Sequence, residues 1–460
     1  MPRRPLDILQ ISTGDVLGGA ERIAYNLHRA YRRRGHRPQM AVGRKAGDDP
    51  DVFRIPHNVT ANPWRRAWWS AHYGMQRLYG RVRGAWYVSR LLQKIAEPAS
   101  VLHWLAGIED FNFPGTWRIL QMCRRPPQVV HAHNLHGRYF DLRYLAPLSR
   151  RLPVIVSLHD AWLLSGHCAH SFDCDRWKTG CGRCPDLSIY PALIRDGTAY
   201  NLRRKSRIYR QSRLHVSVPC RWLRERVEQS VLASGAKEIR TIPNGVDLET
   251  FRPTDMGEAR RSVGLPADAH VLLFSAFGVR ANIWKDYETM RQAAARVASR
   301  VGDKPLVFVA LGEKGPPERF GRAEIRFVRF VRDEKAVAAY YQASDLYVHG
   351  ARIDTFPNAV LEALACGTPV VASAVGGIPE QVVSLDATQD APLNKNEATG
   401  VLVPPQDADA MAAAIERLLT NDPLRARLGQ NAAADARARF DLNRQVDDFL
   451  CWYAELVDRA

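Results

Sequence analysis

Apolar strand-like segments alternate with helical segments along the whole 460-residue chain. This alternation predicts parallel, doubly wound sheets, because two parallel neighbours need a crossover connection that a helix supplies. In the first half we expect strands at Asp7–Ser12, Pro38–Gly43, Val129–Asn134, Val154–His159 and Leu214–Val218. In the second half we expect them at Arg240–Pro243, Val271–Phe277, Pro305–Gly312, Ile325–Phe330, Asp345–His349, Pro369–Ser373 and Val401–Pro404. The sequence therefore predicts an α/β protein.

The length of the chain indicates two domains, because a single hydrophobic core stops growing well below this size. The boundary is expected near residues 230–250, where Asn244-Gly245 is a turn signal and Pro253 ends the segment. We predict a first domain at 1–238 and a second domain at 239–438. A last segment, 439–460, is predicted to contain a helix over Leu442–Leu456 with one apolar face.

Two carboxylates, Asp354 and Glu362, stand eight positions apart in the second half. Asp354 follows a predicted strand, and Glu362 lies about one turn into a helix that residues 356–358 would open. The free N–H groups of a helix start bind phosphate oxygens, and carboxylates accept hydrogen bonds from sugar hydroxyls. The pattern predicts a pocket for a phosphorylated sugar. An ordinary strand, turn and helix with solvated acids is the alternative.

The flanking residues Phe356-Pro357-Asn358 and Gly376-Gly377-Ile378-Pro379-Glu380 make the pattern more specific. The stretch resembles the nucleotide-sugar half of the family 4 retaining glycosyltransferases, with Asp354 in place of the family's first Glu. The resemblance implies the GT-B fold, in which two Rossmann-like domains face a cleft and a C-terminal helix crosses back to the first domain. It also implies that the donor is bound by Asp354, Thr355, Phe356, Pro357, Asn358 and Glu362.

Cations for the donor diphosphate are expected after the strand Val271–Phe277, where Arg280 and Lys285 stand five positions apart. A guanidinium can hold two phosphate oxygens, and an ammonium acts as a point charge. Relatives read Gly-Arg, a short gap and Lys-Gly, whereas Val279 and Asp286 interrupt that pattern here, so Lys285 is the stronger candidate. Glycines let the backbone approach a ligand, and the resemblance implies that the loop Gly18-Gly19 lies at the interdomain cleft beside the diphosphate and the acceptor.

Histidines end two predicted strands of the first domain, at the edge where open α/β sheets bind ligands. His159 follows one strand, and the resemblance implies that it orients the sugar or the acceptor. His133, Asn134 and His136 follow another. They are expected either to line the acceptor pocket or to contact the residues that line it.

The net charge of +17 lies wholly in the first half, since residues 1–220 carry +20 and residues 221–460 carry −3. Residues 61–96 have no acid and mix cations with aromatic side chains: Arg65, Arg66, Arg77, Arg81, Arg83, Arg90 and Lys94 with Trp64, Trp68, Trp69, Tyr73, Tyr79, Trp86 and Tyr87. Such a mixture is typical of a surface that lies on anionic lipid. A helix pair packed on its own domain, or nucleic-acid binding, would explain the same residues.

Half of the eight cysteines fall within the Cys-rich insertion at 166–185: Cys168, Cys174, Cys181 and Cys184. In a reducing compartment such a cluster, ending in Cys-x-x-Cys, favours a structural zinc site, with His167 or His170 as replacement ligands. Disulfides and unligated thiols are the alternatives. Similar insertions occur in the family's polysaccharide-building members.

Together these features and the resemblance imply a retaining glycosyltransferase that uses a UDP- or GDP-sugar and a lipid-linked glycan acceptor in bacterial surface polysaccharide synthesis. The residues expected to carry catalysis are Asp354, His159, Lys285 and Glu362. No catalytic metal and no nucleic-acid partner are expected. The basic start leads straight into a strand, which predicts a cytoplasmic protein. The basic aromatic segment at 61–96 predicts that the protein is peripheral at the inner membrane face. A sugar-nucleotide epimerase, a phosphorylase or a non-enzymatic membrane- or nucleic-acid-binding protein is the alternative.

Overall fold

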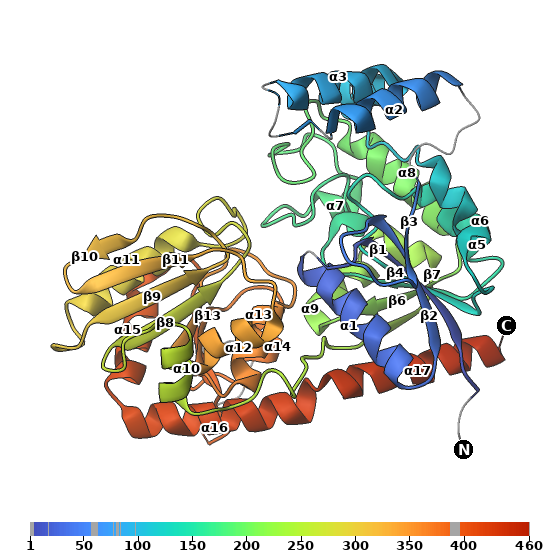
Figure 1. Cartoon of the computed structure of the whole chain (residues 1–460). Coiled ribbons are helices and arrows are strands. Elements are labelled where there is room, and N and C mark those ends of the chain that lie inside the picture. The colour runs from blue at the N-terminus through green and yellow to red at the C-terminus, as the bar shows by residue number, and fades with distance from the viewer. Residues whose placement is uncertain are drawn as a thin grey trace. The chain divides into compact units, whose positions relative to one another are not determined.

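The computed structural model describes residues 4–16, 18–56, 63–76, 78–79, 82, 84–96, 98–386 and 396–459. The chain divides into two compact units. The first contains Met1–Val218, Arg224–Arg240 and Leu450–Ala460, and the second contains Pro219–Leu223 and Thr241–Phe449. Each unit is built around one seven-stranded sheet (Figure 1). These sheets confirm the predicted α/β class.

The sheet of the first unit has the order β3-β2-β1-β4-β5-β6-β7. Its strands are β1 (Asp7–Gly14), β2 (Arg37–Arg44), β3 (Val52–Arg54), β4 (Val129–His133), β5 (Val154–Ser157), β6 (Leu214–Val218) and β7 (Ala236–Thr241). The strands from β3 to β6 pair in parallel. The central strands β1, β4 and β5 are buried on both faces, as the continuous apolar segments predict.

Helices of the first unit cover this sheet and build a separate layer beyond its carboxyl edge, where α2 and α3 lie side by side (Figure 1). They are α1 (Gly19–Arg33), α2 (Pro63–Gln76), α3 (Ala85–Ala96), α4 (Pro98–Leu105), α5 (Ile119–Met122), α6 (Leu145–Leu148), α7 (Arg176–Thr179), α8 (Thr198–Arg210) and α9 (Arg221–Glu228). The first residues of α9 belong to the second unit.

The sheet of the second unit has the order β10-β11-β9-β8-β12-β13-β14. Its strands are β8 (His270–Ser275), β9 (Leu306–Leu311), β10 (Glu318–Phe320), β11 (Ala323–Val328), β12 (Leu346–His349), β13 (Val370–Ser373) and β14 (Gly400–Val403). Only the edge strand β10 pairs antiparallel among the strand pairs described. The order reverses between β8 and β12, which is the switch point where such sheets bind ligands.

The second unit's helices pack on both faces of its sheet. They are α10 (Met256–Ser262), α11 (Tyr287–Ala298), α12 (Glu334–Gln342), α13 (Asn358–Ala365), α14 (Ile378–Gln381), α15 (Ala408–Leu419) and α16 (Asp422–Arg439). The last helix, α17 (Leu442–Asp458), begins in this unit, and its residues from Leu450 onward belong to the first unit. One apolar core joins α11 and α15 to the sheet, through residues such as Phe274, Met290 and Met411.

The end of α17 packs on the first unit's sheet. The hydroxyl of Tyr453 lies 3.0 Å from that of Tyr31 and hydrogen-bonds Nδ1 of His131 at 2.5 Å. Arg240 pairs with Glu455, and the indole of Trp452 donates to Glu238. A buried polar network therefore fixes this end of the helix.

One predicted strand belongs to a different sheet than expected. The strand expected at Arg240–Pro243 in the second half is β7, Ala236–Thr241, at the edge of the first sheet. Its half-exposed residues lack the apolar run that marks a central strand, so the sequence did not reveal its partner. The three-residue edge strands β3 and β10 were too short to predict.

Candidate active site

A cluster of ionisable side chains lies at the switch point of the second sheet. Lys285 forms an ion pair with Asp354, and its Nζ lies 3.1 Å from Nε2 of His349. The same nitrogen of His349 lies 3.3 Å from Oδ2 of Asp354. Lys285 and Asp354 were both predicted from the sequence as donor-site residues, and the structure brings them into direct contact.

Backbone contacts between two loops explain why Lys285 meets Asp354. Lys285 and Ala351 form an isolated antiparallel bridge, and the N–H of Arg352 donates to the carbonyl of Trp284 at 3.0 Å. The N–H of Asp286 also donates to the carbonyl of Gly350 at 3.1 Å. The loop after β8 is therefore tied to the loop after β12.

Two glycines let a third loop approach Asp354. The N–H of Gly377 donates to the carbonyl of Asp354 at 3.2 Å. A Cβ at Gly376 would lie 1.8 Å from that same oxygen, and a Cβ at Gly377 would lie 2.0 Å from the carbonyl oxygen of Thr355. Gly376 also has a positive φ of 59°. The Gly-Gly pair is required because no side chain fits between these backbones.

Charge at this cluster is fixed by its neighbours. Burial alone would raise the pKa of Asp354, but the Lys285 ammonium and His349 outweigh burial and hold that pKa below a carboxyl group's usual range. Burial, with Lys285 adding to it, lowers the pKa of His349 to about 4. At neutral pH Asp354 is therefore a carboxylate and His349 a neutral imidazole. His349, whose Nδ1 lies 2.9 Å from the Tyr347 hydroxyl, was not among the predicted site residues.

Glu362 lies buried on α13, where its Oε2 accepts a hydrogen bond of 2.8 Å from the Tyr341 hydroxyl. Burial and the nearby Glu362 charge raise the pKa of Tyr341 well above its usual value, so Tyr341 stays a donor. The sequence predicted the carboxylate but not its tyrosine partner. Glu362 is therefore held in one orientation.

The remaining predicted donor residues surround the start of α13. Oγ1 of Thr355 is buried and has no hydrogen-bond partner among the described residues. Phe356 packs edge-to-face on Phe440, and Pro357 directly precedes the helix. Oδ1 of Asn358 lies 3.3 Å from Nδ2 of Asn244. Phe356 therefore faces the core, and any donor contact by it would use its backbone.

Arg280 is already engaged by an acid. Its Nε donates to Glu313 at 2.6 Å, its backbone N–H donates to the same carboxylate at 2.8 Å, and its guanidinium lies over the Phe327 ring. This hydrogen bonding by Glu313 raises the pKa of Arg280. Lys285 and Arg280 therefore differ: the structure places Lys285 in the Asp354 cluster and Arg280 in a separate ion pair.

The predicted histidines of the first unit gather at the carboxyl edge of β4 and β5. Nδ1 of His133 lies 3.1 Å from Nε2 of His159, and their rings stack. Nε2 of His136 lies 2.7 Å from Asp160. Burial lowers the pKa of His136, but Asp160 outweighs it and raises that pKa, whereas burial lowers the pKa of His159 to about 4. His136 therefore forms an ion pair with Asp160, and His133 forms a neutral pair with His159.

Asn134 and the Gly18-Gly19 loop complete the predicted residues of this unit. Asn134 has a positive φ of 36°, and its carbonyl accepts a hydrogen bond from the Tyr139 hydroxyl at 2.8 Å. Gly18 and Gly19 start α1, and a Cβ at Gly18 would meet the carboxylate of Glu21 at 2.2 Å. Burial raises the pKa of Glu21. Glu21 and Asp160 are acids at this edge that sequence reasoning did not single out.

The four clustered cysteines line one small cavity together with His167, whose Nε2 lies 3.4 Å from Sγ of Cys184. All are free thiols, and burial raises the pKa of Cys168 and Cys181 to about 11. Among the described residues, no group of three or more His, Cys, Asp or Glu side chains is placed to hold a metal ion. The zinc site stays a prediction.

Zinc analysis of the purified protein checks it. If zinc binds here, we expect about one zinc per chain and four thiols protected from a thiol reagent until a chelator is added. Replacing Cys168 by serine should release the metal, whereas replacing the exposed Cys451 should not. Four reactive thiols and no zinc would contradict the prediction.

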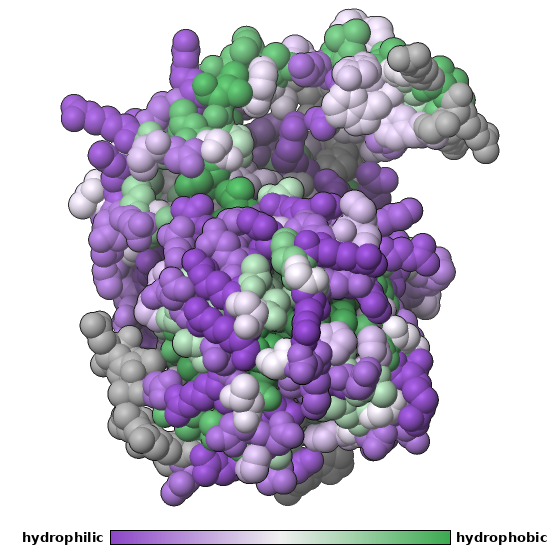
Figure 2. All heavy atoms as spheres, turned by 90° about the vertical axis from the view of Figure 1, so that its left-hand side faces the viewer, coloured by the Kyte–Doolittle hydropathy of each residue, from purple (hydrophilic) through white to green (hydrophobic). Residues whose placement is uncertain are grey.

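The basic aromatic segment forms the helical layer of α2 and α3. His72 and Ser89, both buried, hydrogen-bond one another between the two helices, so part of the segment packs on itself. Large hydrophobic side chains nevertheless remain exposed on α3, and Figure 2 shows hydrophobic atoms along the upper edge of the molecule. Arg77, Arg81 and Arg83 lie outside the described residues. None of the described helices is long and apolar enough to cross a membrane.

Comparisons with known proteins agree with this architecture. The family model described as Glycosyltransferase Family 4 matches residues 17–250, and the one described as Glycosyl transferases group 1 matches residues 255–435. A structure of HepE from Anabaena with UDP and glucose is 16% identical, covers 98% of this chain and 100% of its own, and has a TM-score of 0.62. The fold is therefore GT-B, as predicted.

Two curated relatives match over most of their length. D-inositol 3-phosphate glycosyltransferase 1 of Catenulispora acidiphila is 29% identical over 73% of this chain and 75% of its own. The putative colanic acid biosynthesis glycosyl transferase WcaC of Escherichia coli is 24% identical over 80% of this chain and 83% of its own. The chain belongs to glycosyltransferase family 4, and it is a sugar-transferring enzyme.

Proposed function

We propose that the chain is a retaining glycosyltransferase that transfers a sugar from a UDP- or GDP-sugar to a lipid-linked glycan acceptor in bacterial surface polysaccharide synthesis. The observation that carries the donor site is the Lys285, Asp354 and His349 cluster at the switch point of the second sheet. The start of α13 follows directly, and the buried Thr355 hydroxyl before it has no hydrogen-bond partner in the part of the chain that the structure describes. A lysine ammonium and the free N–H groups of a helix start bind the oxygens of a diphosphate, and a carboxylate accepts hydrogen bonds from sugar hydroxyls.

In this proposal each group has one role. The Lys285 ammonium and the N–H groups at the start of α13 stabilise the negative charge of the departing diphosphate. Asp354 accepts hydrogen bonds from the transferred sugar, and Glu362 accepts them from the ribose. The acceptor hydroxyl attacks the sugar on the same face from which the diphosphate leaves, so the configuration of the sugar is retained. The leaving phosphate oxygen takes the proton of that hydroxyl. His159 orients the sugar or the acceptor.

Two similar proteins support two parts of the proposal. The HepE structure contains UDP and glucose, which supports a nucleotide-sugar donor. WcaC is named for colanic acid biosynthesis, which supports a polysaccharide product. In this proposal the enzyme is cytoplasmic and works at the inner membrane face, with α2 and α3 toward anionic lipid. A lipid-linked acceptor would be found at that face, and the exposed aromatic side chains of these helices suit contact with lipid headgroups.

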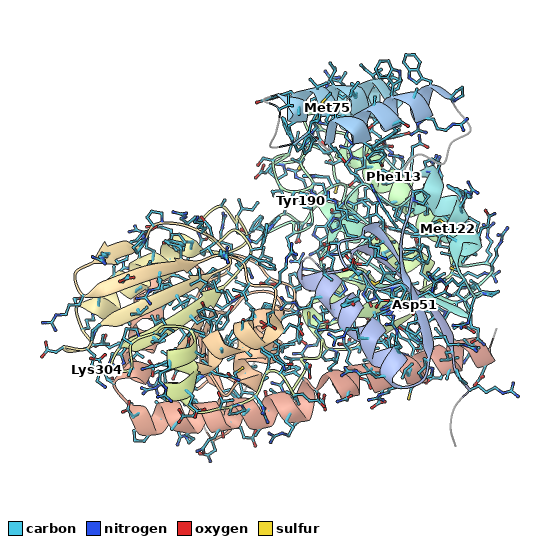
Figure 3. The ribbon with its side chains drawn as sticks, in the orientation of Figure 1. Asp51, Met75, Phe113, Met122, Tyr190 and Lys304 are labelled. Carbon is cyan, nitrogen blue, oxygen red and sulfur yellow. The ribbon has the colours of Figure 1, made fainter. Side chains whose placement is uncertain are left out.

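A thermal-shift screen with UDP, GDP and their sugar conjugates tests the donor assignment. Ligand at about 100 times its Kd stabilises by about 2.7 kcal/mol, which should raise the melting temperature by roughly 5–10 °C. We expect one nucleotide to do so, and Lys285→Ala to abolish the shift. The matched control is Lys304→Ala, an exposed lysine of the same unit, which should keep it (Figure 3). A shift that survives in Lys285→Ala would contradict the assignment.

A further inference from the structure

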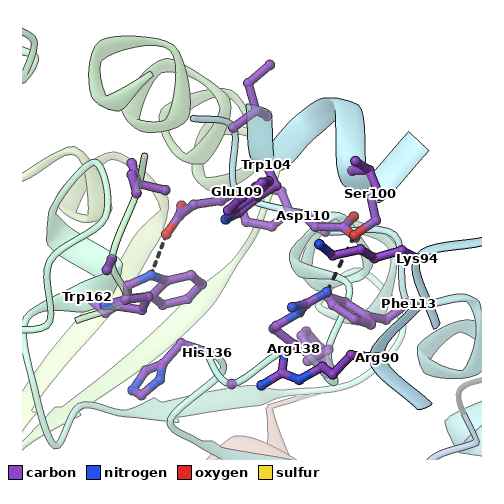
Figure 4. A pocket seen from close by; sticks show the side chains of 18 of the residues that line it. Arg90, Lys94, Ser100, Trp104, Glu109, Asp110, Phe113, His136, Arg138 and Trp162 are labelled. Carbon is purple, nitrogen blue, oxygen red and sulfur yellow. Dashed lines mark hydrogen bonds between the residues drawn. The ribbon is translucent and has the colours of Figure 1, made fainter. Parts of the chain in front are cut away.

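A cavity of about 680 Å³ lies within the first unit, beneath α3 and α4. Its volume suits a ligand of the size of a short saccharide or a prenyl chain. Trp86, Trp104 and Phe113 are among its aromatic walls, and His136 and Trp162 form the part nearest β4 and β5 (Figure 4). Figure 3 places Phe113 between the helical layer and the sheet. The cavity therefore reaches from the predicted acceptor residue His136 to the basic aromatic segment.

Three cations line one side of this cavity. Arg90 and Lys94 are four residues apart on α3 and so project from one face of the helix. Arg138 joins them from the loop after β4, where it has a positive φ of 62°. Figure 4 shows the three side chains gathered on the side away from Trp162.

None of these cations forms an ion pair with an acid of the described chain. Their contacts are with neutral groups: Arg138 lies 3.5 Å from Oγ of Ser100, Arg90 lies over the Trp86 ring, and Lys94 lies over the Trp104 ring. Glu109, an acid of the cavity wall, is instead neutralised by Lys205 at 3.0 Å and accepts from the Trp162 indole at 2.6 Å. Asp110, the other acid that lines the cavity, lies 3.8 Å from Nδ1 of His103. The three cations therefore outnumber the acids of the cavity wall, and this side has an excess of positive charge.

We propose that this cavity binds the acceptor, and that Arg90, Lys94 and Arg138 hold the phosphate or diphosphate that joins its saccharide to a lipid. The proposal rests on the proposed function and names the acceptor's class, a glycosyl phosphate or diphosphate carried on an apolar chain. Cations that are not paired with acids bind phosphate oxygens, and these three outnumber the acids of the cavity wall. The aromatic walls pack against sugar faces or the first units of the chain, and the saccharide extends toward His136.

The exposed residues beside the cavity suit the remainder of such a ligand. Tyr87 and Leu91 on α3 line the cavity and are 73% and 56% exposed. An apolar chain leaving the cavity would pass these side chains and continue into a bilayer. A free phosphorylated sugar has the same headgroup chemistry but no chain to occupy them.

Titration of the full chain with geranyl diphosphate, followed by tryptophan fluorescence, tests the proposal, because three tryptophans line the cavity. We expect saturable binding, and binding at least about tenfold weaker in the Arg90→Ala, Lys94→Ala, Arg138→Ala triple variant. The single variant Arg138→Ala should weaken it by a smaller factor. Glucose 1-phosphate should bind more weakly than geranyl diphosphate, because it has no apolar chain, and equal binding of the two would contradict the proposed ligand class.

Control variants separate this inference from the donor assignment. Arg66→Ala removes an exposed cation of α2 that does not line the cavity, and it should leave binding unchanged. Lys285→Ala should lose the nucleotide response and keep the geranyl diphosphate response, whereas the triple variant should do the reverse. A wild-type protein that responds to geranyl diphosphate but to no nucleotide would overturn the proposed donor chemistry and keep the cavity's ligand class.

Two results would overturn the inference. One is equal binding of geranyl diphosphate by the wild type and by a triple variant with an unchanged melting temperature. The other is a triple variant that loses only its binding to phosphatidylglycerol vesicles, which would show that the cations serve a lipid surface.

Discussion

Replacing Asp354 by asparagine is expected to lower kcat by about 10²–10³-fold. The carboxylate is held ionised by Lys285 and His349, and an amide of the same shape cannot match its charge. The hydroxyls of the transferred sugar would then lose a charged hydrogen-bond acceptor, and Lys285 would lose the carboxylate with which it forms an ion pair. Asp354→Glu, which restores the carboxylate with one more methylene, should keep more activity than the asparagine variant. Steady-state kinetics with the identified donor measures both.

The control for Asp354→Asn is Asp303→Asn. Asp303 also pairs with a cation, Arg322, but its side chain is 98% exposed. A surface pair contributes little, so the control should have wild-type activity and stability. If Asp354→Asn kept its activity within about threefold of the wild type, the assignment of Asp354 to the sugar site would be wrong.

Lys205→Met is expected to destabilise the first unit by about 3–5 kcal/mol. The Lys205 side chain is fully buried, where its ammonium pairs with Glu109 and donates to the carbonyl oxygens of Trp162 and Ser165 at 2.9 and 3.0 Å. Methionine fills the same volume but leaves a buried carboxylate without its cation. Thermal and urea unfolding, monitored by circular dichroism, measures the loss.

Two further variants test the reason for that loss. Lys178→Met removes a lysine from a surface pair with Asp175 and should change stability by about 0.5 kcal/mol or less. The double variant Lys205→Met, Glu109→Gln should lose less than the sum of the single losses, because no unpaired charge remains buried. Full additivity would show that the two side chains do not stabilise each other.

The sequence predicted residues whose chemistry follows from local pattern. Asp354 and Lys285 each follow a strand with an apolar run, and Gly376-Gly377 marks a point where backbones meet. The strands were predictable because their burial pattern is repeated in consecutive residues. The edge strands and the sheet to which β7 belongs were not, because short, half-exposed strands lack that pattern.

The sequence by itself determined the α/β class, the family and the residue types at the donor site, because these depend on local periodicity and short motifs. Only the tertiary structure decided that His349 joins Lys285 and Asp354, that Glu313 engages Arg280, and that Lys205 neutralises Glu109. Lys205 and Glu109 are 96 positions apart, and the cavity beside them is lined by residues from 86 to 193. Contacts at such separations depend on how the chain packs, which no local pattern encodes.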